Sequence, residues 1–231
     1  LRTVLEQIKD RYGLKVDTHL PSIAYRETIT RKAEGHARHK KQTGGAGQFG
    51  EVYLRIEPLP RGAGFEFKSE VVGGAIPTGF IPAVETGVKQ VMEAGATHGF
   101  PMQDIKVIVY DGKHHSVDSK EIAFVQAGKK AFMDAVAKAR PIVMEPIVDV
   151  AVTVPSNNAG GVAGDLSTMR GMVSGTETLP DNNIVVQGQA PLKEVQGYHS
   201  RLKSLTGGDG SFTMDFSHYA EAPLNTVDRA S

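Results

Sequence analysis

Cysteine and tryptophan are both absent from this chain of 231 residues. Without cysteine it can form no disulfide, thiolate metal site or cysteine nucleophile, which is typical of proteins in a reducing cytosol. An excess of charge is absent too, because 26 Lys and Arg residues balance 26 Asp and Glu residues. No global field therefore draws the chain onto nucleic acid or anionic lipid, and any such contact must be local.

Long apolar runs are also missing. Stretches such as 106–110 and 151–154 are too short to cross a bilayer, and no basic-then-apolar leader opens the sequence. We therefore expect a soluble cytoplasmic protein with no membrane partner. Leu1, Val4, Leu5 and Ile8 form an apolar stripe with no N-cap before it, which favours a fragment of a longer protein.

The length and the 40% hydrophobic content favour two domains. A short strand is expected at Tyr12–His19, as the tail of a domain that precedes the chain. Alternation and helical spacing then predict strands at 23–30, 51–57, 65–72 and 102–110, and helices at 81–94 and 119–139. Asp118 and Glu121 suggest a capping box for the second helix.

The second half follows a stretch interpreted as a hinge, Pro141–Pro146. Strands are predicted at 147–154, 172–178, 184–190 and 212–216, and helices at 162–169 and 192–205. The order βαββαβ is typical of a ferredoxin-like unit. The expected class is α+β, with two compact domains.

Two polar segments carry the strongest functional signal, Arg31–Gly50 and Tyr110–Glu121. Both are expected to be loops at one end of the first domain. The first carries five cations and two histidines against a single acid, Glu34. Rigid scaffolds that present such loops suit contact with phosphate backbones.

The glycines at 45, 47 and 50 also fit G-x-G-x-x-G, the dinucleotide-binding pattern. That reading requires a strand before the glycines and a helix after them, and here a strand follows instead. A flexible hairpin with no partner remains an alternative. The pattern G-x-x-x-x-G-K-[ST] is absent, so this chain alone is not expected to hydrolyse a nucleotide.

Two other roles can be considered for the histidines of the second segment, His114 and His115, and both have little support in the sequence. As metal ligands with Asp118 they would point to opposite sides of an extended backbone, and no third ligand is evident. His115 as a general base has no partnered nucleophile in the sequence. We expect neither a metal site nor a catalytic residue. A solvated turn histidine is the commonest alternative, and an exposed histidine that donates hydrogen bonds to RNA competes with it.

Several segments together closely resemble the C-terminal half of bacterial elongation factor G, a translational GTPase. They include KKQTGGAGQFGEV at 40–52, GGAIPTGFIPAVETG at 73–87, YDGKHHSVDSKEIAF at 110–124, GDLSTMRGMVSG at 164–175 and SFTMDFSHYAEAP at 211–223. The resemblance implies the end of domain III at 1–20, an S5-like domain IV with a left-handed βαβ crossover at 21–142, a ferredoxin-like domain V at 143–223 and a tail at 224–231.

This resemblance also implies a function. The domain IV tip would enter the ribosomal decoding region beside tRNA and mRNA, and so promote GTP-dependent translocation. GTP and Mg²⁺ would bind in a domain outside this chain, which itself would hold no cofactor. The expected partners are ribosomal RNA, tRNA and mRNA rather than DNA, and the expected state is a monomer. The residues implied at the tip are Gly44, Gly45, Gly47, Gln48, Gly50, His114, His115, Asp118 and Lys120, and the RNA-facing cations are Arg38, Lys40, Lys41, Arg170, Arg201 and Lys203.

Some positions depart from the family pattern and suggest a divergent paralogue. Ala46, Phe49 and Glu51 stand where Arg, Tyr and His are usual, and Met169 and Asp209 where cations are common. His114 and Lys120 replace a usual Tyr and Ser. A paralogue that recycles ribosomes or protects them from tetracycline-type drugs is a related alternative. Alternatives of other classes are a regulatory module that binds a small ligand and, because of the S5-like half, a small-molecule kinase.

Overall fold

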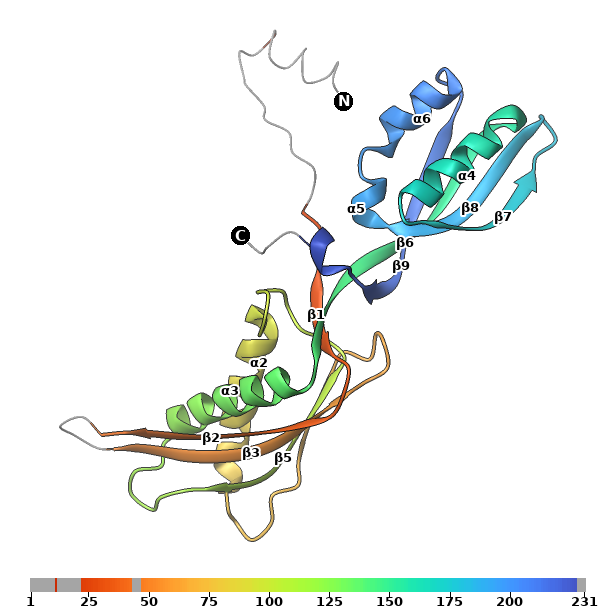
Figure 1. Ribbon diagram of the computed structural model, residues 1–231. Coiled ribbons are helices and arrows are strands. Elements are labelled where there is room, and N and C mark those ends of the chain that lie inside the picture. The colour runs from red at the N-terminus through yellow and green to blue at the C-terminus, as the bar shows by residue number, and fades with distance from the viewer. Residues whose placement is uncertain (1–10, 12–21, 43–46, 228–231) are drawn as a thin grey trace.

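The computed structural model describes residue 11 and residues 22–42 and 47–227, which form two lobes along an elongated molecule (Figure 1). The apolar stripe predicted at Leu1–Ile8 and the strand predicted at Tyr12–His19 lie outside these residues. No helix in the described part of the chain is long and apolar enough to cross a membrane.

The first lobe is a four-stranded sheet in the order β2-β3-β5-β4. Its strands are β2 (Ala33–Lys41), β3 (Gln48–Pro58), β4 (Phe65–Ser69) and β5 (Ile105–Lys113). β4 and β5 are parallel and the other neighbours antiparallel. The 3-10 helix η1 (Thr78–Phe80) and α2 (Ile81–Ala94) connect β4 to β5, and α3 (Glu121–Lys138) follows β5.

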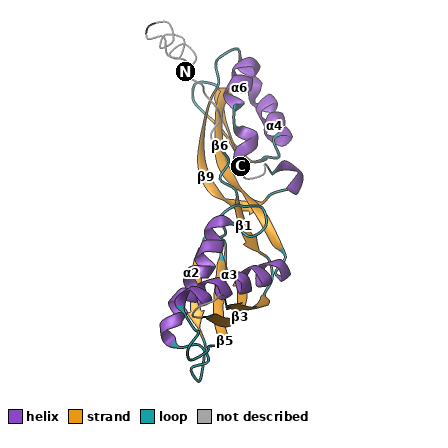
Figure 2. Ribbon diagram, turned by 90° about the vertical axis from the view of Figure 1, so that its left-hand side faces the viewer, coloured by secondary structure: helices purple, strands orange, loops and turns teal. Residues whose placement is uncertain are grey.

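Both long helices of this lobe lie beside its sheet (Figure 2), and their apolar stripes are buried. Val84, Val88 and Val91 of α2 are buried, as are Phe124 and Phe132 of α3. The residues Val52, Leu54 and Ile56 of β3 meet them from the sheet and are fully buried. The periodicity that predicted these elements therefore reflects one shared core.

The segment expected to be the first polar loop is mostly a strand. β2 pairs with β3 along its whole length, from Ala33 opposite Ile56 to Lys41 opposite Gln48. Small residues alternate with the charged ones along β2, and Ala33 and Ala37 pack on the core. The loop prediction was wrong because it weighed the charges and not this alternation.

The second lobe has the predicted βαββαβ order. It comprises β6 (Pro141–Pro155), α4 (Ala159–Thr168), β7 (Met172–Thr178), β8 (Asn183–Pro191), α5 (Leu192–Val195), α6 (Tyr198–Thr206) and β9 (Ser211–Glu221), with the 3-10 helices η2 (Ser156–Asn158) and η3 (Leu224–Thr226). The sheet runs β9-β6-β8-β7 with antiparallel neighbours. The helix predicted at 192–205 is broken at Gly197, whose φ of 81° is left-handed. The α+β class is confirmed.

One strand joins the lobes. β6 begins at Pro141 and runs without interruption through the segment interpreted as a hinge. β1 (Arg26–Ile29) pairs with its first four residues, and β9 pairs with it from Met144 onward. A small cluster of Tyr25, Phe100, Val143 and Ala222 is buried beside this crossing. The connection is therefore built as continuous sheet.

Candidate functional site

The two polar segments meet at the end of the first lobe that is distant from the second lobe (Figure 1). The Phe49 N–H donates to the Asp118 carbonyl at 2.9 Å, and the Ser119 hydroxyl donates to the Phe49 carbonyl at 3.0 Å. These bonds join the β2–β3 hairpin to the turn between β5 and α3. We call this end the tip: residues 38–42, 47–51 and 113–121. Gly44 and Gly45 lie outside the described residues.

Two glycines let the hairpin pack closely on the turn. A Cβ at Gly47 would lie 2.8 Å from Asp118 Cγ, and one at Gly50 would lie 3.1 Å from the Ala123 carbonyl carbon. Both glycines are buried. Gly47 and Gly50 therefore allow close packing within the tip. From the sequence, these glycines were interpreted as allowing a close approach to RNA.

His115 is held by the backbone of its own turn. Its Nδ1 accepts N–H bonds from Val117 at 3.3 Å and Asp118 at 3.2 Å, and lies 3.5 Å from Asp118 Oδ2. Its own N–H donates to Ser119 Oγ at 2.8 Å. When Nδ1 accepts, the ring proton resides on Nε2. The side chain is 54% exposed, so the turn presents the Nε2–H donor to solvent.

The neighbours of His115 play different parts. His114 is exposed, with Nδ1 3.3 Å from the Ala75 carbonyl. Lys120 is exposed and is the N-cap of α3, with no side-chain capping bond. The capping box predicted from Asp118 and Glu121 was therefore wrong: Asp118 instead closes the tip turn.

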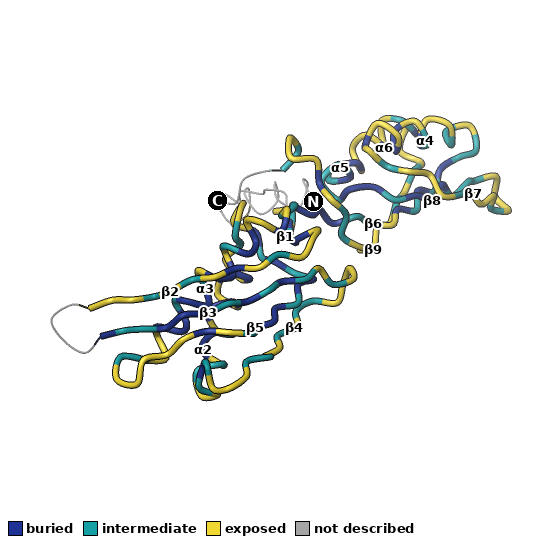
Figure 3. Tube along the Cα trace, turned by 60° about the horizontal axis from the view of Figure 1, so that its bottom comes forward, coloured by how far each residue is buried: buried dark blue, intermediate teal, exposed yellow. Residues whose placement is uncertain are grey.

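A shallow hollow of about 190 Å³ lies at the tip. Lys40 and Lys41 line one side, and Gln48, His115 and Asp118 line the rest with the hairpin end. Both lysines are exposed, and neither forms an ion pair with the residues that the structure describes. They belong to the end of β2 that Figure 3 colours as exposed. The hollow therefore combines two available cations with the His115 N–H donor.

Arg38 faces a different partner. Glu51 lies opposite it in the sheet, is 1% exposed, and accepts hydrogen bonds from Arg38 at 3.2 Å and His36 Nε2 at 2.7 Å. Burial opposes ionisation of Glu51, but these donors outweigh it and lower the pKa of that carboxyl below its ordinary value. His36 also stacks on Tyr53, with ring centroids 4.1 Å apart. Glu51 therefore offsets the charge of Arg38.

The cations predicted in the second lobe lie far from the tip. Arg170 forms two bonds to buried Glu145, at 2.7 and 2.9 Å, and one to Glu194 at 3.1 Å. Arg201 pairs with Asp165, with its Nε 2.9 Å from Oδ1. Lys203 is exposed. Both arginines are thus offset by carboxylates.

The sequence reading missed those carboxylates, although a signal for one was present. Glu145 stands inside the otherwise apolar run PIVMEPIV, and a buried acid requires a cationic or hydrogen-bonding partner. No cluster of three His, Cys, Asp or Glu side chains suited to a metal ion occurs in the described ranges.

Comparisons with known proteins agree with this architecture. Residues 21–140 match the family model for elongation factor G, domain IV, and residues 142–230 match the model for the elongation factor G C-terminus. Elongation factor G of Aquifex pyrophilus is 46% identical over 229 residues, which are 99% of this chain and 33% of that protein. An elongation factor G-like protein of Thermotoga maritima is 43% identical and is covered to 34%.

Among solved structures, a crystal structure from Thermus thermophilus aligns with a TM-score of 0.85 and 42% identity, covering 97% of this chain and 33% of that one. The chain thus spans about a third of the length of the relatives that it matches. The resemblance noted in the motifs is confirmed. The chain belongs to the elongation factor G family, of which it carries domain IV followed by the C-terminal domain.

Proposed function

We propose that this chain is the ribosome-contacting arm of an elongation factor G-like translation factor. Its tip would enter the decoding region beside tRNA and mRNA and promote their translocation in the cytoplasm. GTP hydrolysis would take place in a GTPase domain of the intact factor, with GTP and Mg²⁺ bound there and not in this arm. The factor would act as a monomer.

The observation that carries the proposal is the joining of the hairpin end to the β5–α3 turn. Lys40, Lys41 and His115 come together there on a sheet backed by α2 and α3, so the contact groups are held by a rigid scaffold. Lysines at such a site can displace counterions from phosphates, and an imidazole N–H donor can reach a base or a phosphate. Gly44, Gly45, His114 and Lys120 complete the proposed tip.

The second lobe contributes less charge than the family resemblance implied. Arg170 and Arg201 are offset by acids, and Lys203 is an exposed cation. We propose that RNA binding by this arm is centred on Lys40 and Lys41. Arg38 would contribute less, because Glu51 offsets its charge.

Replacing His115 by Ala in the intact factor tests the tip. We expect single-round translocation to slow by about tenfold, which corresponds to the loss of one hydrogen bond of roughly 1.4 kcal/mol. Ribosome-stimulated GTP turnover should be retained, because the nucleotide site lies elsewhere. His115→Gln keeps an N–H donor and should recover part of the rate.

His199→Ala is the matched control, since that histidine is exposed on α6 in the other lobe. It should leave both activities unchanged. An equal loss of translocation and GTP turnover in His115→Ala would contradict a role for the tip in moving tRNA.

A further inference from the structure

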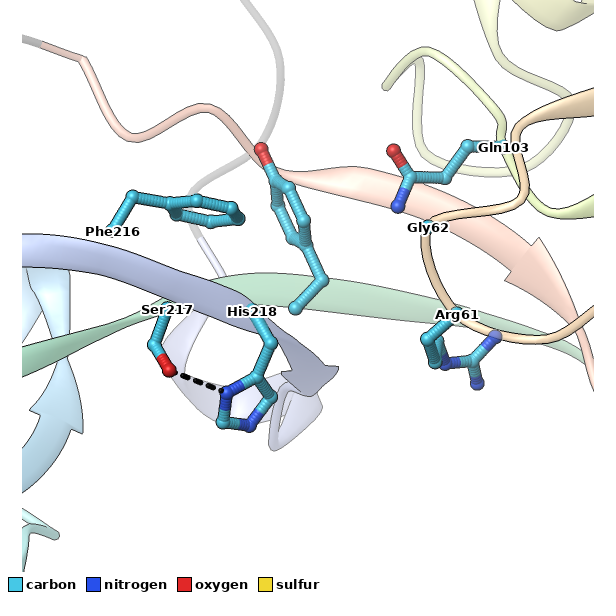
Figure 4. A pocket seen from close by; sticks show the side chains of 7 residues that line it. Arg61, Gly62, Gln103, Phe216, Ser217 and His218 are labelled. Atoms are coloured by element: carbon cyan, nitrogen blue, oxygen red, sulfur yellow. Dashed lines mark hydrogen bonds between the residues drawn. The ribbon is translucent and has the colours of Figure 1, made fainter.

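A second hollow lies at the junction of the lobes and has a different character (Figure 4). It measures about 320 Å³ and is lined by Arg61, Gly62 and Gln103 of the first lobe and by residues 216–219 of the second. Ligand pockets occur preferentially between domains, and this volume is at the lower end of their usual range. The hollow therefore suits a small group and not an extended ligand.

The wall from the second lobe is aromatic. Phe216 is 61% exposed, and its ring centroid lies 5.4 Å from that of Tyr219 at an angle of 58°. Tyr219 is held in place because its hydroxyl donates to the Ala24 carbonyl at 2.9 Å. An accessible phenyl ring beside a fixed tyrosine is a stacking surface for a planar ring such as a nucleobase.

The wall from the first lobe brings positive charge on a fixed loop. Buried Asp104 accepts the N–H groups of Gly62 at 3.1 Å and Gly64 at 3.0 Å, which clamps the loop that bears Arg61. Arg61 is exposed and forms no ion pair within the described ranges. Figure 4 shows it across the hollow from Phe216, on the same side as the Gln103 amide.

The lining contains no Asp or Glu. His218 adds a polar ring at the edge, where its Nδ1 lies 3.1 Å from Ser217 Oγ. A stacking surface, an available guanidinium and an amide thus converge on the hollow. The Gln103 Nε2 also donates to Asp104 Oδ2 at 3.4 Å, but Asp104 is not among the lining residues. These are the groups that recognise the ring, the phosphate and the base edge of a nucleotide.

We propose that the junction hollow binds a single unstacked nucleotide of RNA, with its base stacked on Phe216 beside Tyr219 and its phosphate on Arg61. This rests on the proposed function, because the ribosome is where the arm would meet RNA. Since the walls come from both lobes, the bound nucleotide would also favour the lobe arrangement in which those walls face each other.

The test uses the 231-residue chain with Lys40→Ala and Lys41→Ala, so that the tip contributes little. Binding of a fluorescein-labelled six-nucleotide adenylate strand is followed by fluorescence anisotropy at several salt concentrations. Adding Phe216→Ala should weaken binding on the order of tenfold, as is usual for the loss of one stacked base. Phe216→Tyr should retain it.

Arg61→Ala should weaken binding and lower the slope of log affinity against log salt by about 0.7, the value for one phosphate contact on a single strand. Met214→Ala, a partly exposed apolar residue of the same strand, and Lys130→Ala, an exposed cation of α3, are the matched controls and should change neither quantity.

Unchanged affinity in both Phe216→Ala and Arg61→Ala would overturn the proposal. It would also be overturned if adenosine monophosphate bound as tightly as the strand with the same sensitivity to both variants, since the site would then take a free nucleotide. Ribosome binding by the intact factor is measured in parallel with Lys40→Ala and Lys41→Ala. If the lysine variants weaken ribosome binding while the junction variants leave strand binding unchanged, only this inference is rejected. If the lysine variants leave ribosome binding unchanged, the proposed role of the tip is rejected.

Discussion

Glu27 shows how one buried side chain organises a loop. It is 0% exposed, and its carboxylate accepts five hydrogen bonds from residues 96–100: four from backbone N–H groups and one from the Thr97 hydroxyl. Burial alone would raise the pKa of Glu27, but the hydrogen bonds together lower it below its ordinary value. The charged form is therefore the one that the fold stabilises.

Replacing Glu27 by Gln should destabilise the first lobe by about 3 kcal/mol at pH 7, because an amide nitrogen would face N–H donors. The lowered pKa means that the carboxylate stabilises the fold fully above the unfolded value of about 4.3, and that this stabilisation is lost as the pH falls through the folded pKa. Urea unfolding followed by circular dichroism measures both effects.

The difference in the free energy of unfolding between the parent chain and Glu27→Gln should thus shrink below about pH 4. Glu93→Gln is the control, because Glu93 is exposed on α2 and should change stability little. A difference that stays constant from pH 7 to pH 3 would show that the charge of Glu27 is not what the loop requires.

At the scale of elements, β2 depends on a glycine where it meets α3. A Cβ at Gly35 would lie 2.0 Å from the Ala131 carbonyl oxygen and 2.7 Å from the Ala135 N. Nothing flexible occupies that position, since both atoms belong to the helix backbone. The distance between β2 and α3, and hence the position of Lys40 and Lys41 at the end of the strand, is set by this contact.

We expect Gly35→Ala to destabilise the first lobe by about 3 kcal/mol, because α3 must move away from the sheet. Thermal unfolding measures the loss, and ribosome binding by the intact factor should weaken as the tip is displaced. At Gly79 an added Cβ would have no neighbour within 4 Å, so Gly79→Ala serves as the control. Equal melting temperatures for the two variants would mean that the helix and strand adjust without cost.

At the scale of the whole molecule, β6 sets how the lobes are joined. Its fifteen residues pair with β1 at the first-lobe end and with β8 and β9 in the second lobe. The Tyr25 and Phe100 rings pack beside the crossing, with centroids 5.1 Å apart. A continuous strand with a packed cluster resists bending more than a loop would, so we expect the two lobes to keep their relative arrangement.

Phe100→Ala should lower stability by about 3 kcal/mol and loosen the lobe arrangement, because Phe100 is only 8% exposed in the junction cluster. Differential scanning calorimetry measures the first effect, and small-angle X-ray scattering measures the second as a broader distribution of interatomic distances. Phe216→Ala removes an exposed ring near the same junction and is the control for stability. If Phe100→Ala lowered the melting temperature and left the scattering curve unchanged, the cluster would stabilise the fold without fixing the shape.

The elements that were predicted correctly are those with a local cause. The bounds of α2 and β7 agree with the prediction. A valine stripe at helical spacing, and a short strand bounded by Gly171 and Pro180, are complete signals within the segment. The motifs of the tip were also visible, since glycines, lysines and histidines in these orders occur in elongation factor G. The sequence by itself therefore determined the fold class, the family and the segments that form the tip.

What needed the tertiary structure involves partners far apart in the chain. Whether Arg38, Arg170 and Arg201 carry available charge depends on Glu51, Glu145 and Asp165, which reach them only through strand pairing and packing. The strand β2 also depends on distant partners, because its polar sequence forms a strand only where β3 and α3 cover its small residues. The junction hollow has no local signal, because Arg61 and Phe216 are brought together only when β6 aligns the two lobes. Charge pairing and packing act through space, and so the fold decides them.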